Sequence, residues 1–315
     1  MNKFNVYFHK DFDGICSAAL FSELVSNYNL VETKEFNYIP VDYHLKDKWL
    51  TQPLLQPNAV LDFLFHQDAE WWYDHHVSTF LTPEIKKKYK KNNVRQFWNT
   101  EFQSCPSLIK THFLKHWTLF SGTLERFDEW ITWSNKIDSA LYDSPSEIIE
   151  LKHPCLQIYA SLGKDSSDPY LTFLINSIRK LSPSELANTN EVQEKYKIVR
   201  SEQNKIIEDL KGEFKFENGV VFLDQAKFNY PYQRYLSYYF YPEAQYTVGI
   251  FKKNTRTFSI SLGKNPWKEF QHKNLGKLSE KYGGGGRPTV GGILCDDYSQ
   301  SVDIAQKIIK YLSRK

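Results

Sequence analysis

Asp74, His75 and His76 are three consecutive polar residues that follow the apolar run Trp71–Tyr73. An aromatic strand that ends in this triplet would hold a carboxylate and two imidazoles at the tip of a sheet, where ligands of open α/β folds bind. Taken alone, the triplet is more simply explained as chance or as buried histidines with satisfied hydrogen bonds. The other acidic and histidine residues of the chain therefore decide between these interpretations.

A second polar group, His9, Asp11 and Asp13, lies between a short apolar run and an expected helix over residues 15–24. In an extended backbone, a spacing of two points all three side chains the same way. Gly14 permits a tight turn or a close approach of backbone. A capping aspartate before the helix would explain one of the three residues, but not all three, so we favour a functional role.

Two further carboxylates belong to Asp62 and Asp138. Asp62 lies inside the apolar run Ala59–Phe65, which predicts a strand, and a buried carboxylate is costly unless it is paired or binds a metal. Asp138 follows an expected helix over residues 124–134. Periodicity alone describes Asp138 as an ordinary helix-end or turn residue.

Together these residues would form a carboxylate-rich cluster at one edge of a sheet: His9, Asp11, Asp13, Asp62, His75 and Asp138. Carboxylates gathered in this way repel one another and shift one another's protonation, and two divalent cations would cancel their charge. Carboxylates and imidazoles without thiolates suit Mn²⁺ or Mg²⁺ better than zinc or copper. Two metals about 3.5–4 Å apart can activate a bridging water and hold a phosphoryl group, so we expect hydrolysis of a phosphate ester or anhydride.

The elements that must position this cluster are predicted strands separated by helical stretches, a pattern typical of a parallel, right-handed, doubly wound α/β sheet. The strands are expected over residues 4–8, 36–41, 59–65, 71–74 and 94–98. Helices are expected over residues 15–24, 107–120 and 124–134, and residues 151–181 are predicted to be largely helical.

An amphipathic helix is expected over residues 188–211, where apolar residues recur three, four or seven positions apart and Gly212 follows as a stop. We interpret residues 186–213 as a connector between a metal-binding catalytic domain (1–185) and a smaller substrate-binding α/β domain with a mixed sheet (214–315). Within the smaller domain, strands are expected over residues 219–223, 245–251 and 257–262, an aromatic helix over 230–241, and a final strand followed by a helix over 302–312.

Four consecutive glycines, Gly283–Gly286, precede Arg287 near the end of the chain. Backbone N–H groups of such a run can close on an anion, and a guanidinium pairs with phosphate in a fork. The run is not a Walker A loop, because no Lys-Ser or Lys-Thr follows it, and a flexible loop is the alternative. The lysine-rich segment Glu84–Arg95 is more simply a solvated helix face, although a positive rim that attracts phosphates stays open.

The composition is that of an ordinary globular protein, with 41% hydrophobic residues and a net charge of +3. This mild positive charge does not oppose an anionic substrate. The four cysteines are far apart and form no Cys-x-x-Cys pair, which disfavours a zinc site and indicates reduced thiols. We find no signal peptide and no apolar run of transmembrane length, and expect a cytoplasmic protein that does not contact a membrane.

These motifs resemble those of the DHH phosphoesterases, a family named for the triplet that stands here as Asp74-His75-His76. The segment His9–Gly14 resembles the first motif of the family, Asp62 the second and Asp138 the fourth. The segment Tyr282–Gly286 resembles the glycine motif of the DHH-associated C-terminal domain, and Asn265–Trp267 is similar to a substrate-domain sequence of one subgroup. The resemblance spans nearly the whole chain.

The resemblance implies a site with two Mn²⁺ ions, or Mg²⁺ in their place. One metal would be held by His9 and Asp11, the other by Asp13, His75 and Asp138, with Asp62 as a bridge. The residues implied in catalysis are Asp62, His75 and His76, and His76 would contact the scissile phosphate. Asp74 would orient a neighbouring ligand. The residues implied in substrate binding, besides His76, are Gly284, Gly285, Gly286 and Arg287.

One position departs from the family pattern. Many members carry a histidine after the glycines, where this chain has Arg287. Arginine binds phosphate but cannot donate a proton at neutral pH, so we assign Arg287 a binding role only.

We therefore expect a Mn²⁺-dependent phosphodiesterase that hydrolyses short oligonucleotides or dinucleotides by a two-metal mechanism. A hydrolase of cyclic dinucleotides or other small phosphoesters is the alternative within the same class. A non-catalytic nucleotide-binding module on the same fold is the alternative outside it, and the full donor set argues against that module. Trp267 could stack on a base or pack in the core, and the two interpretations are equally open.

Overall fold

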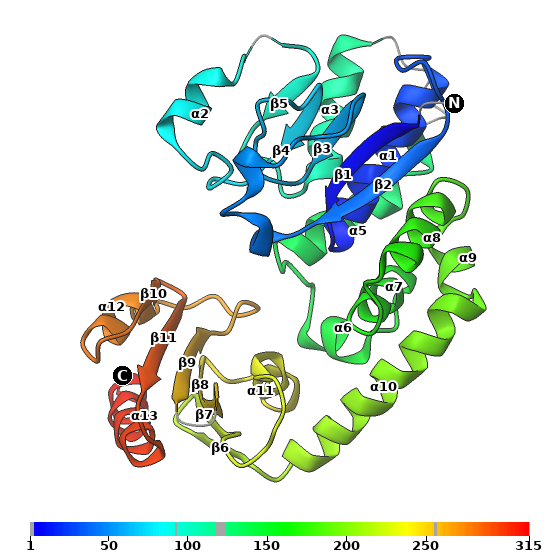
Figure 1. The fold of residues 1–315 in the computed structure, drawn as a ribbon. Helices are drawn as coiled ribbons and strands as arrows, with labels where there is room; N and C mark the ends of the chain where they lie inside the picture. Colours follow the sequence, from blue (N-terminus) through cyan, green and yellow to red (C-terminus); the bar gives the residue numbers. More distant parts are fainter. Residues whose placement is uncertain (1–2, 92, 118–123, 255–256, 315) are drawn as a thin grey trace. The chain divides into compact units, whose positions relative to one another are not determined.

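The computed structural model describes residues 3–91, 93–117, 124–254 and 257–314. The chain divides into two compact units (Figure 1). The first holds the residues up to 142 and residues 152–199, and the second holds residues 143–151 and the chain from residue 200 onward. The chain thus passes between the units three times. One passage lies within the long helix α10 (Asn190–Leu210), and the short helix α6 (Pro145–Glu150) belongs to the second unit.

The first unit contains a five-stranded sheet in which every pairing is parallel, with the strand order β2-β1-β3-β4-β5. The strands are β1 (Phe4–His9), β2 (Phe36–Val41), β3 (Asn58–Leu61), β4 (Trp71–Asp74) and β5 (Gln96–Trp98). The predicted parallel α/β sheet is confirmed, and the predicted bounds of β2 and β4 agree with the structure.

The register of this sheet aligns polar residues at its carboxyl edge. Phe8 pairs with Leu61, which in turn pairs with Tyr73. The residue after each of the three is polar, so His9, Asp62 and Asp74 lie in one row across three neighbouring strands. The sheet therefore brings together side chains that are more than sixty positions apart in the sequence.

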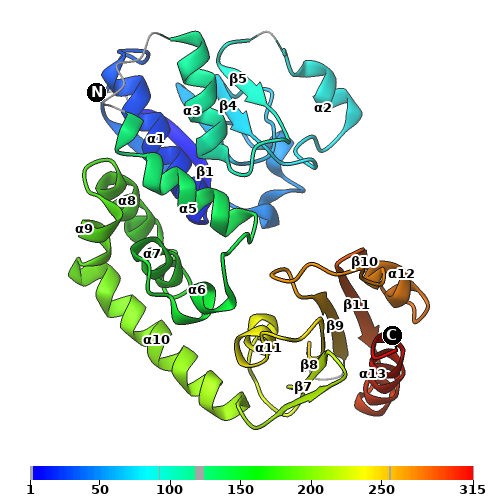
Figure 2. The same cartoon turned by 180° about the vertical axis from the view of Figure 1, so that it is seen from behind.

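Helices cover one face of the sheet (Figure 2). Helix α1 (Phe12–Asn27) is buried over nearly its whole length, because it contacts β1 on one side and α3 (Cys105–His116), α5 (Asp128–Asp138) and α8 (Asp168–Ile178) on the others. Through these contacts the beginning of α1 and the end of α5 are fixed relative to the carboxyl edge of β1.

The opposite face is built differently from the prediction. Between β2 and β4, where every residue is described, the structure has no α-helix, only the short 3₁₀ helices η1 (Tyr43–Leu45) and η2 (Trp49–Thr51) and irregular chain around β3. Buried aromatic side chains, among them Trp49 and Phe63, pack on the sheet instead, together with Ile85 of α2 (Pro83–Lys88). The expectation that helical stretches separate all the strands is therefore wrong here, because large aromatic side chains of short turns cover this face.

The predicted strand over residues 59–65 ends early, at Leu61. The backbone N–H of Asp62 still donates to the carbonyl of Tyr73 at 2.8 Å, but Asp62 itself has a φ of 55°. This left-handed conformation, which aspartate tolerates better than most residues, turns the chain away from the sheet. Asp62 is therefore the first residue after β3 rather than a residue within a strand.

Other boundaries shift by a few residues. The helix predicted from residue 107 is α3, which begins at Cys105 and ends at His116, and residues 118–120 of the prediction lie outside the described residues. The helix predicted over 124–134 is α5, which begins at Asp128 and ends at Asp138. The largely helical region consists of α7 (Pro154–Leu162), α8 and, after it, α9 (Pro183–Ala187).

The second unit contains a six-stranded mixed sheet with the order β10-β11-β9-β8-β7-β6. Of the strand pairs described in it, only β7 and β8 are parallel, so the predicted mixed sheet is confirmed. The strands are β6 (Phe214–Glu217), β7 (Val220–Asp224), β8 (Tyr246–Lys252), β9 (Phe258–Lys264), β10 (Gly285–Arg287) and β11 (Val290–Cys295).

The helices described in the second unit after α10 are α11 (Arg234–Phe240), α12 (Leu275–Glu280) and α13 (Tyr298–Leu312). Helix α13 packs Ala305, Ile308 and Leu312 into the core. Among the described helices, none combines the length and apolar character needed to cross a membrane.

Gly14 permits the close packing of α1 against the end of β1. A Cβ atom at this position would lie 1.8 Å from the backbone oxygen of His9, which confirms the predicted close approach. We expect Gly14→Ala to lower the free energy of unfolding by about 1–3 kcal/mol or more, as overpacking does. Gly212→Ala is the control, with an expected change within about 0.5 kcal/mol, because a Cβ there meets nothing within 4 Å. Urea unfolding of both variants measures the difference, and equal stabilities would contradict the prediction.

Candidate metal centre

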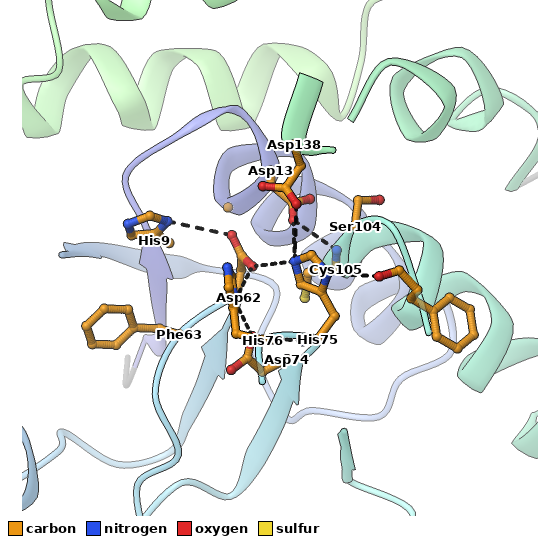
Figure 3. Close-up of polar contacts among 12 residues, drawn as sticks. His9, Asp13, Asp62, Phe63, Asp74, His75, His76, Ser104, Cys105 and Asp138 are labelled. Carbon is orange, nitrogen blue, oxygen red and sulfur yellow. Dashed lines mark hydrogen bonds and ion pairs between the residues drawn. The ribbon is translucent and has the colours of Figure 1, made fainter. Parts of the chain in front are cut away.

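The ends of three strands and two helices converge at the carboxyl edge of the parallel sheet (Figure 3). The polar residues there come from the end of β1, the chain after β3 and β4, the beginning of α1 and the end of α5, and they include His9, Asp13, Asp62, Asp74, His75, His76 and Asp138. The structure thus brings together the residues that the sequence predicts as metal ligands.

The first donor set consists of His9, Asp11 and Asp62, whose donor atoms lie within 4.8 Å of one another. The Nδ1 atom of His9 is 2.7 Å from Asp11 Oδ2 and 3.8 Å from Asp62 Oδ2. These atoms could bind one cation between them.

The second donor set consists of Asp13, His75 and Asp138, again with donor atoms within 4.8 Å of one another. The Nε2 atom of His75 is 3.3 Å from Asp13 Oδ2 and 3.7 Å from Asp138 Oδ2. It is also 3.5 Å from Asp62 Oδ1. Asp62 thus directs one carboxylate oxygen toward each donor set, which is the arrangement of a carboxylate that bridges two metals.

The donor atoms are those that a metal would satisfy. Asp62 is 0% exposed, yet neither of its carboxylate oxygens has a hydrogen-bond partner among the described residues, and the same holds for His75 Nε2. Buried polar atoms without partners are rare because each costs about 1–3 kcal/mol. Asp62 Oδ1 and His75 Nε2 lie 3.5 Å apart without hydrogen-bond geometry, which fits ligands arranged around a common cation. The carboxylate and imidazole donors present here therefore fit Mn²⁺ or Mg²⁺.

Asp13 is held in place by two helices. Its Oδ2 atom accepts from the backbone N–H of Cys105 at 2.9 Å, and its Oδ1 atom accepts from the Ser134 hydroxyl at 2.8 Å. Ser104 precedes α3 but its side chain does not cap the helix and instead donates to Asn135. Asp13 therefore satisfies an N–H group at the beginning of α3, where the helix dipole favours a negative charge.

The two histidines are each oriented by a single acceptor. The Nδ1 atom of His75 lies 3.0 Å from the carbonyl of Phe102, which directs Nε2 to the carboxylates. Asp74 is 1% exposed, and its Oδ1 atom accepts from the backbone N–H groups of His75 and His76. The same oxygen lies 2.8 Å from His76 Nδ1, which leaves the Nε2 atom of His76 available for other contacts.

Several of these supporting groups were missed by the sequence reasoning: Phe102, Cys105, Ser134 and Asn135. Two of them act through backbone atoms, which leave no signal in the residue type. Ser134 and Asp138 are four positions apart on α5 and thus lie on one helical face, so the spacing could have suggested Ser134 once Asp138 was chosen.

The predicted extended spacing of His9, Asp11 and Asp13 is wrong. Only His9 ends a strand, because α1 begins at Phe12. Asp11 is the N-cap and accepts from the Gly14 N–H at 2.9 Å, and Asp13 lies in the first turn of the helix. The three side chains meet at the site because the chain turns from strand to helix. The capping interpretation therefore holds for Asp11, which also belongs to the first donor set, and Asp138 is both the last residue of α5 and part of the second set.

The electrostatics of the cluster in the absence of metal reflect its density of carboxylates. Burial, and then repulsion from Asp13, raises the pKa of Asp62 well above its ordinary value. The same two causes raise the pKa of Asp138 to about 6. Burial alone would lower the pKa of His75, but Asp13 and Asp62 outweigh it and raise that pKa to about 12. A protonated His75 thus supplies positive charge that a bound cation would otherwise provide.

The residues predicted outside this cluster have separate surroundings. Gly285, Gly286 and Arg287 form the exposed edge strand β10 of the second unit, with Gly284 just before it. Trp267 packs beside Tyr235 and Tyr238 in a core of that unit, which favours the packing interpretation.

The lysine-rich segment is helical only in α2, as far as its residues are described. Lys87, Lys88, Lys90 and Lys91 are exposed or partly exposed there, which agrees with a solvated surface.

Comparison with known proteins shows the fold. No family model and no curated protein matches the sequence. Among solved structures, a pGpG-specific phosphodiesterase, PggH, from Vibrio cholerae is similar with a TM-score of 0.71 and 18% sequence identity, over 99% of this chain and 98% of that one. The DHH domain of a protein described as a member of a ribosomal protein family is similar with a TM-score of 0.51 and 13% identity, over 99% of this chain and 87% of that one. The predicted resemblance to DHH proteins is thus confirmed at the level of the fold.

Removal of the shared carboxylate should lower the stabilisation by metal. A ligand present at a hundred times its Kd adds about 2.7 kcal/mol to the free energy of unfolding, so we expect Mn²⁺ to raise the Tm of EDTA-treated protein. Asp62→Asn should lose most of that increase. Asp68→Asn, at an exposed carboxylate of the same loop, should retain it. Thermal unfolding with and without Mn²⁺ measures the shifts, and an undiminished shift in Asp62→Asn would argue against a bridging role.

Without metal, the stability should depend on the protonation of Asp138. A carboxyl group whose pKa is raised on folding favours the folded state when protonated. The contribution of Asp138 to the free energy of unfolding is complete below its ordinary pKa of 3.8. It is lost as the pH rises through the folded-state pKa of about 6. In EDTA, the stability of the wild type should therefore increase relative to Asp138→Asn as the pH falls from about 7 toward about 4. Tm values across this range test the sign, and parallel curves would contradict it.

Proposed function

We propose that the protein is a divalent-metal-dependent phosphodiesterase that hydrolyses short oligonucleotides or dinucleotides with the help of two metal ions, Mn²⁺ or Mg²⁺. The observation that carries this proposal is the buried Asp62 carboxylate, which directs one oxygen toward each of two donor sets. A single structural cation would need only one of these sets. Paired sites that share a carboxylate are typical of enzymes that displace a group at phosphorus.

Each residue of the site has a separate part in this proposal. When bound, two divalent cations would supply a water of lowered pKa and neutralise charge that develops on the phosphoryl group. Asp62, His75 and the other residues of the two donor sets would hold these cations at fixed positions. His76 is oriented by Asp74 and turns its free ring nitrogen to the scissile phosphate, where it binds an oxygen of the substrate.

The substrate class is inferred from the site and the fold together. A pGpG-specific phosphodiesterase shares the fold, and a dinucleotide offers a phosphodiester to the paired donor sets. Within the proposal, residues 1–185 form the metal-binding domain, residues 186–213 a connector, and residues 214–315 the substrate-binding domain. Arg287 is exposed on β10 and would bind a second phosphate with the glycines before it.

Hydrolysis of a substrate panel tests the proposal. The panel contains a dinucleotide, short RNA and DNA oligomers, cyclic dinucleotides and pyrophosphate, each with Mn²⁺ and with EDTA. We expect Mn²⁺-dependent cleavage, greatest for the dinucleotide. Asp62→Ala should lower kcat by at least about 10²–10³-fold, as loss of transition-state electrostatics does. Arg287→Ala should mainly raise KM, by about ten-fold or more, because a hydrogen bond to a charged group contributes about 1.5–3 kcal/mol.

Two outcomes would contradict the proposal. A near-normal rate in Asp62→Ala, with Asp68→Ala as the matched control, would overturn the two-metal site. Binding of Mn²⁺ and a dinucleotide without cleavage of any member of the panel would favour the non-catalytic nucleotide-binding module.

A further inference from the structure

Tyr43 is an exposed aromatic residue beside the metal centre. It is the first residue of η1, two positions after the end of β2. Val41, the last residue of β2, pairs with His9, so the chain leaves the sheet on the same edge as the donor sets. Tyr43 therefore approaches the site from the strand next to β1.

The ring of Tyr43 contacts side chains on both sides of the site. Its centroid lies 5.2 Å from that of His9, which belongs to the first donor set, and 6.4 Å from that of His76. The ring also contacts Phe63, with a centroid distance of 5.3 Å and a tilted arrangement. Phe63 is 0% exposed, whereas Tyr43 is 41% exposed. The Tyr43 ring is thus held against a fully buried aromatic residue and is still partly open to solvent.

The turn that carries Tyr43 is held by its own hydrogen bonds and an ion pair. The Asp42 side chain accepts from the His44 N–H at 3.0 Å, forms an ion pair with Lys10 and contacts the His44 ring. The carbonyl of Asp42 accepts from the N–H of Leu45, also at 3.0 Å. The backbone that carries the ring is thus held before any ligand arrives, so little of its conformational entropy would be lost on binding.

We propose that the exposed ring of Tyr43 stacks on the base of the nucleoside next to the scissile phosphate, and so selects phosphodiesters that carry a planar base. This inference rests on the proposed function, because it assumes that a phosphodiester lies at the donor sets. Tyr43 would be a specificity residue and not a ligand.

The ring, rather than the hydroxyl group, is the element that the structure prepares. Among the described residues the hydroxyl of Tyr43 makes no hydrogen bond that would orient it, whereas the ring has aromatic contacts to three neighbours. Stacking on an aromatic face tolerates any base, because every base has a π-face. The structure therefore predicts a preference for a base over no base, rather than for one base over another.

Kinetics on substrates with and without a base test the inference. The substrates are a dinucleotide and two analogues in which a tetrahydrofuran abasic unit replaces one nucleoside or the other. Loss of stacking at a single base corresponds to a change of about 5- to 150-fold. For the dinucleotide, Tyr43→Ala should raise KM by at least about five-fold with little change in kcat, and Tyr43→Phe should behave as the wild type. For the analogue that lacks the stacked base, Tyr43→Ala should have no further effect.

Two controls separate this role from a structural one. Leu114→Ala removes a similarly exposed apolar side chain of the same unit, from the far end of α3, and should leave KM unchanged. The rise of Tm on addition of Mn²⁺ should be the same in Tyr43→Ala as in the wild type. If Tyr43→Ala raises KM equally for the dinucleotide and both abasic analogues, the stacking role is wrong. The same holds if Tyr43→Phe raises KM as much as Tyr43→Ala does.

The test also works if the proposed function fails. Should the wild type bind the dinucleotide without cleaving it, anisotropy of a fluorescent dinucleotide measures the Kd for the wild type and Tyr43→Ala in Mn²⁺. An increase of about five-fold or more in the variant would support stacking, and an unchanged Kd would overturn it. Cleavage by the wild type with an unchanged KM in Tyr43→Ala would overturn the stacking alone and leave the proposed function standing.

Discussion

The repulsion among carboxylates around the buried Asp62 is the constraint on which the rest of the first unit depends. Asp62 is 0% exposed and Asp13 is 3% exposed, and the Asp13 charge raises the cost of ionising both Asp62 and Asp138. Charges in such a site are stabilised only by opposite charge and by hydrogen-bond donors. The protonated ring of His75 and the N–H group at the beginning of α3 supply part of this compensation. Two cations would supply the remainder, one of them in place of the proton on the His75 ring, and this requirement favours a binding site over a structural network.

The fold brings this cluster together through strand register and helix ends. A parallel sheet places the carboxyl ends of all its strands at one edge, and the register of β1, β3 and β4 places His9, Asp62 and Asp74 in one row. The helix ends complete the site, since Asp13 lies in the first turn of α1 and Asp138 ends α5. Gly14 allows α1 to start directly against His9. The geometry of the donor sets is therefore a consequence of packing between elements that are each stable for other reasons.

Position within apolar runs was sufficient to predict the parallel sheet, because strands β2 and β4 are bounded by clear changes of polarity. The six residues grouped as candidate ligands do lie together in the structure, but Asp138 ends a helix and its position in the pattern did not distinguish it from an ordinary helix-end residue. The conformation at individual residues was not predictable in the same way. Asp62 interrupts an apolar run that continues to Phe65, so nothing in the pattern marks the left-handed turn that ends β3. The extended spacing expected for His9, Asp11 and Asp13 is wrong because α1 begins before Asp13. The choice between a capping role and a functional role for Asp11 was also too narrow, since one aspartate can both cap a helix and belong to a donor set. Phe102 and Cys105 act through backbone atoms, so only the folded structure identifies them.

Tyr43 illustrates a different limit of sequence reasoning. The chain contains twenty tyrosines, so the residue type of Tyr43 alone carries no information about function. Its significance comes from its partial exposure together with its contacts to a buried core aromatic and to two histidines of the cluster. Under the proposed function, cations held by the carboxylate cluster would recognise only the charge of a phosphoester and not the groups attached to it. Discrimination among phosphoesters would then have to come from groups that contact the rest of the substrate, and the proposed role of Tyr43 assigns that part to an aromatic ring next to the donor sets.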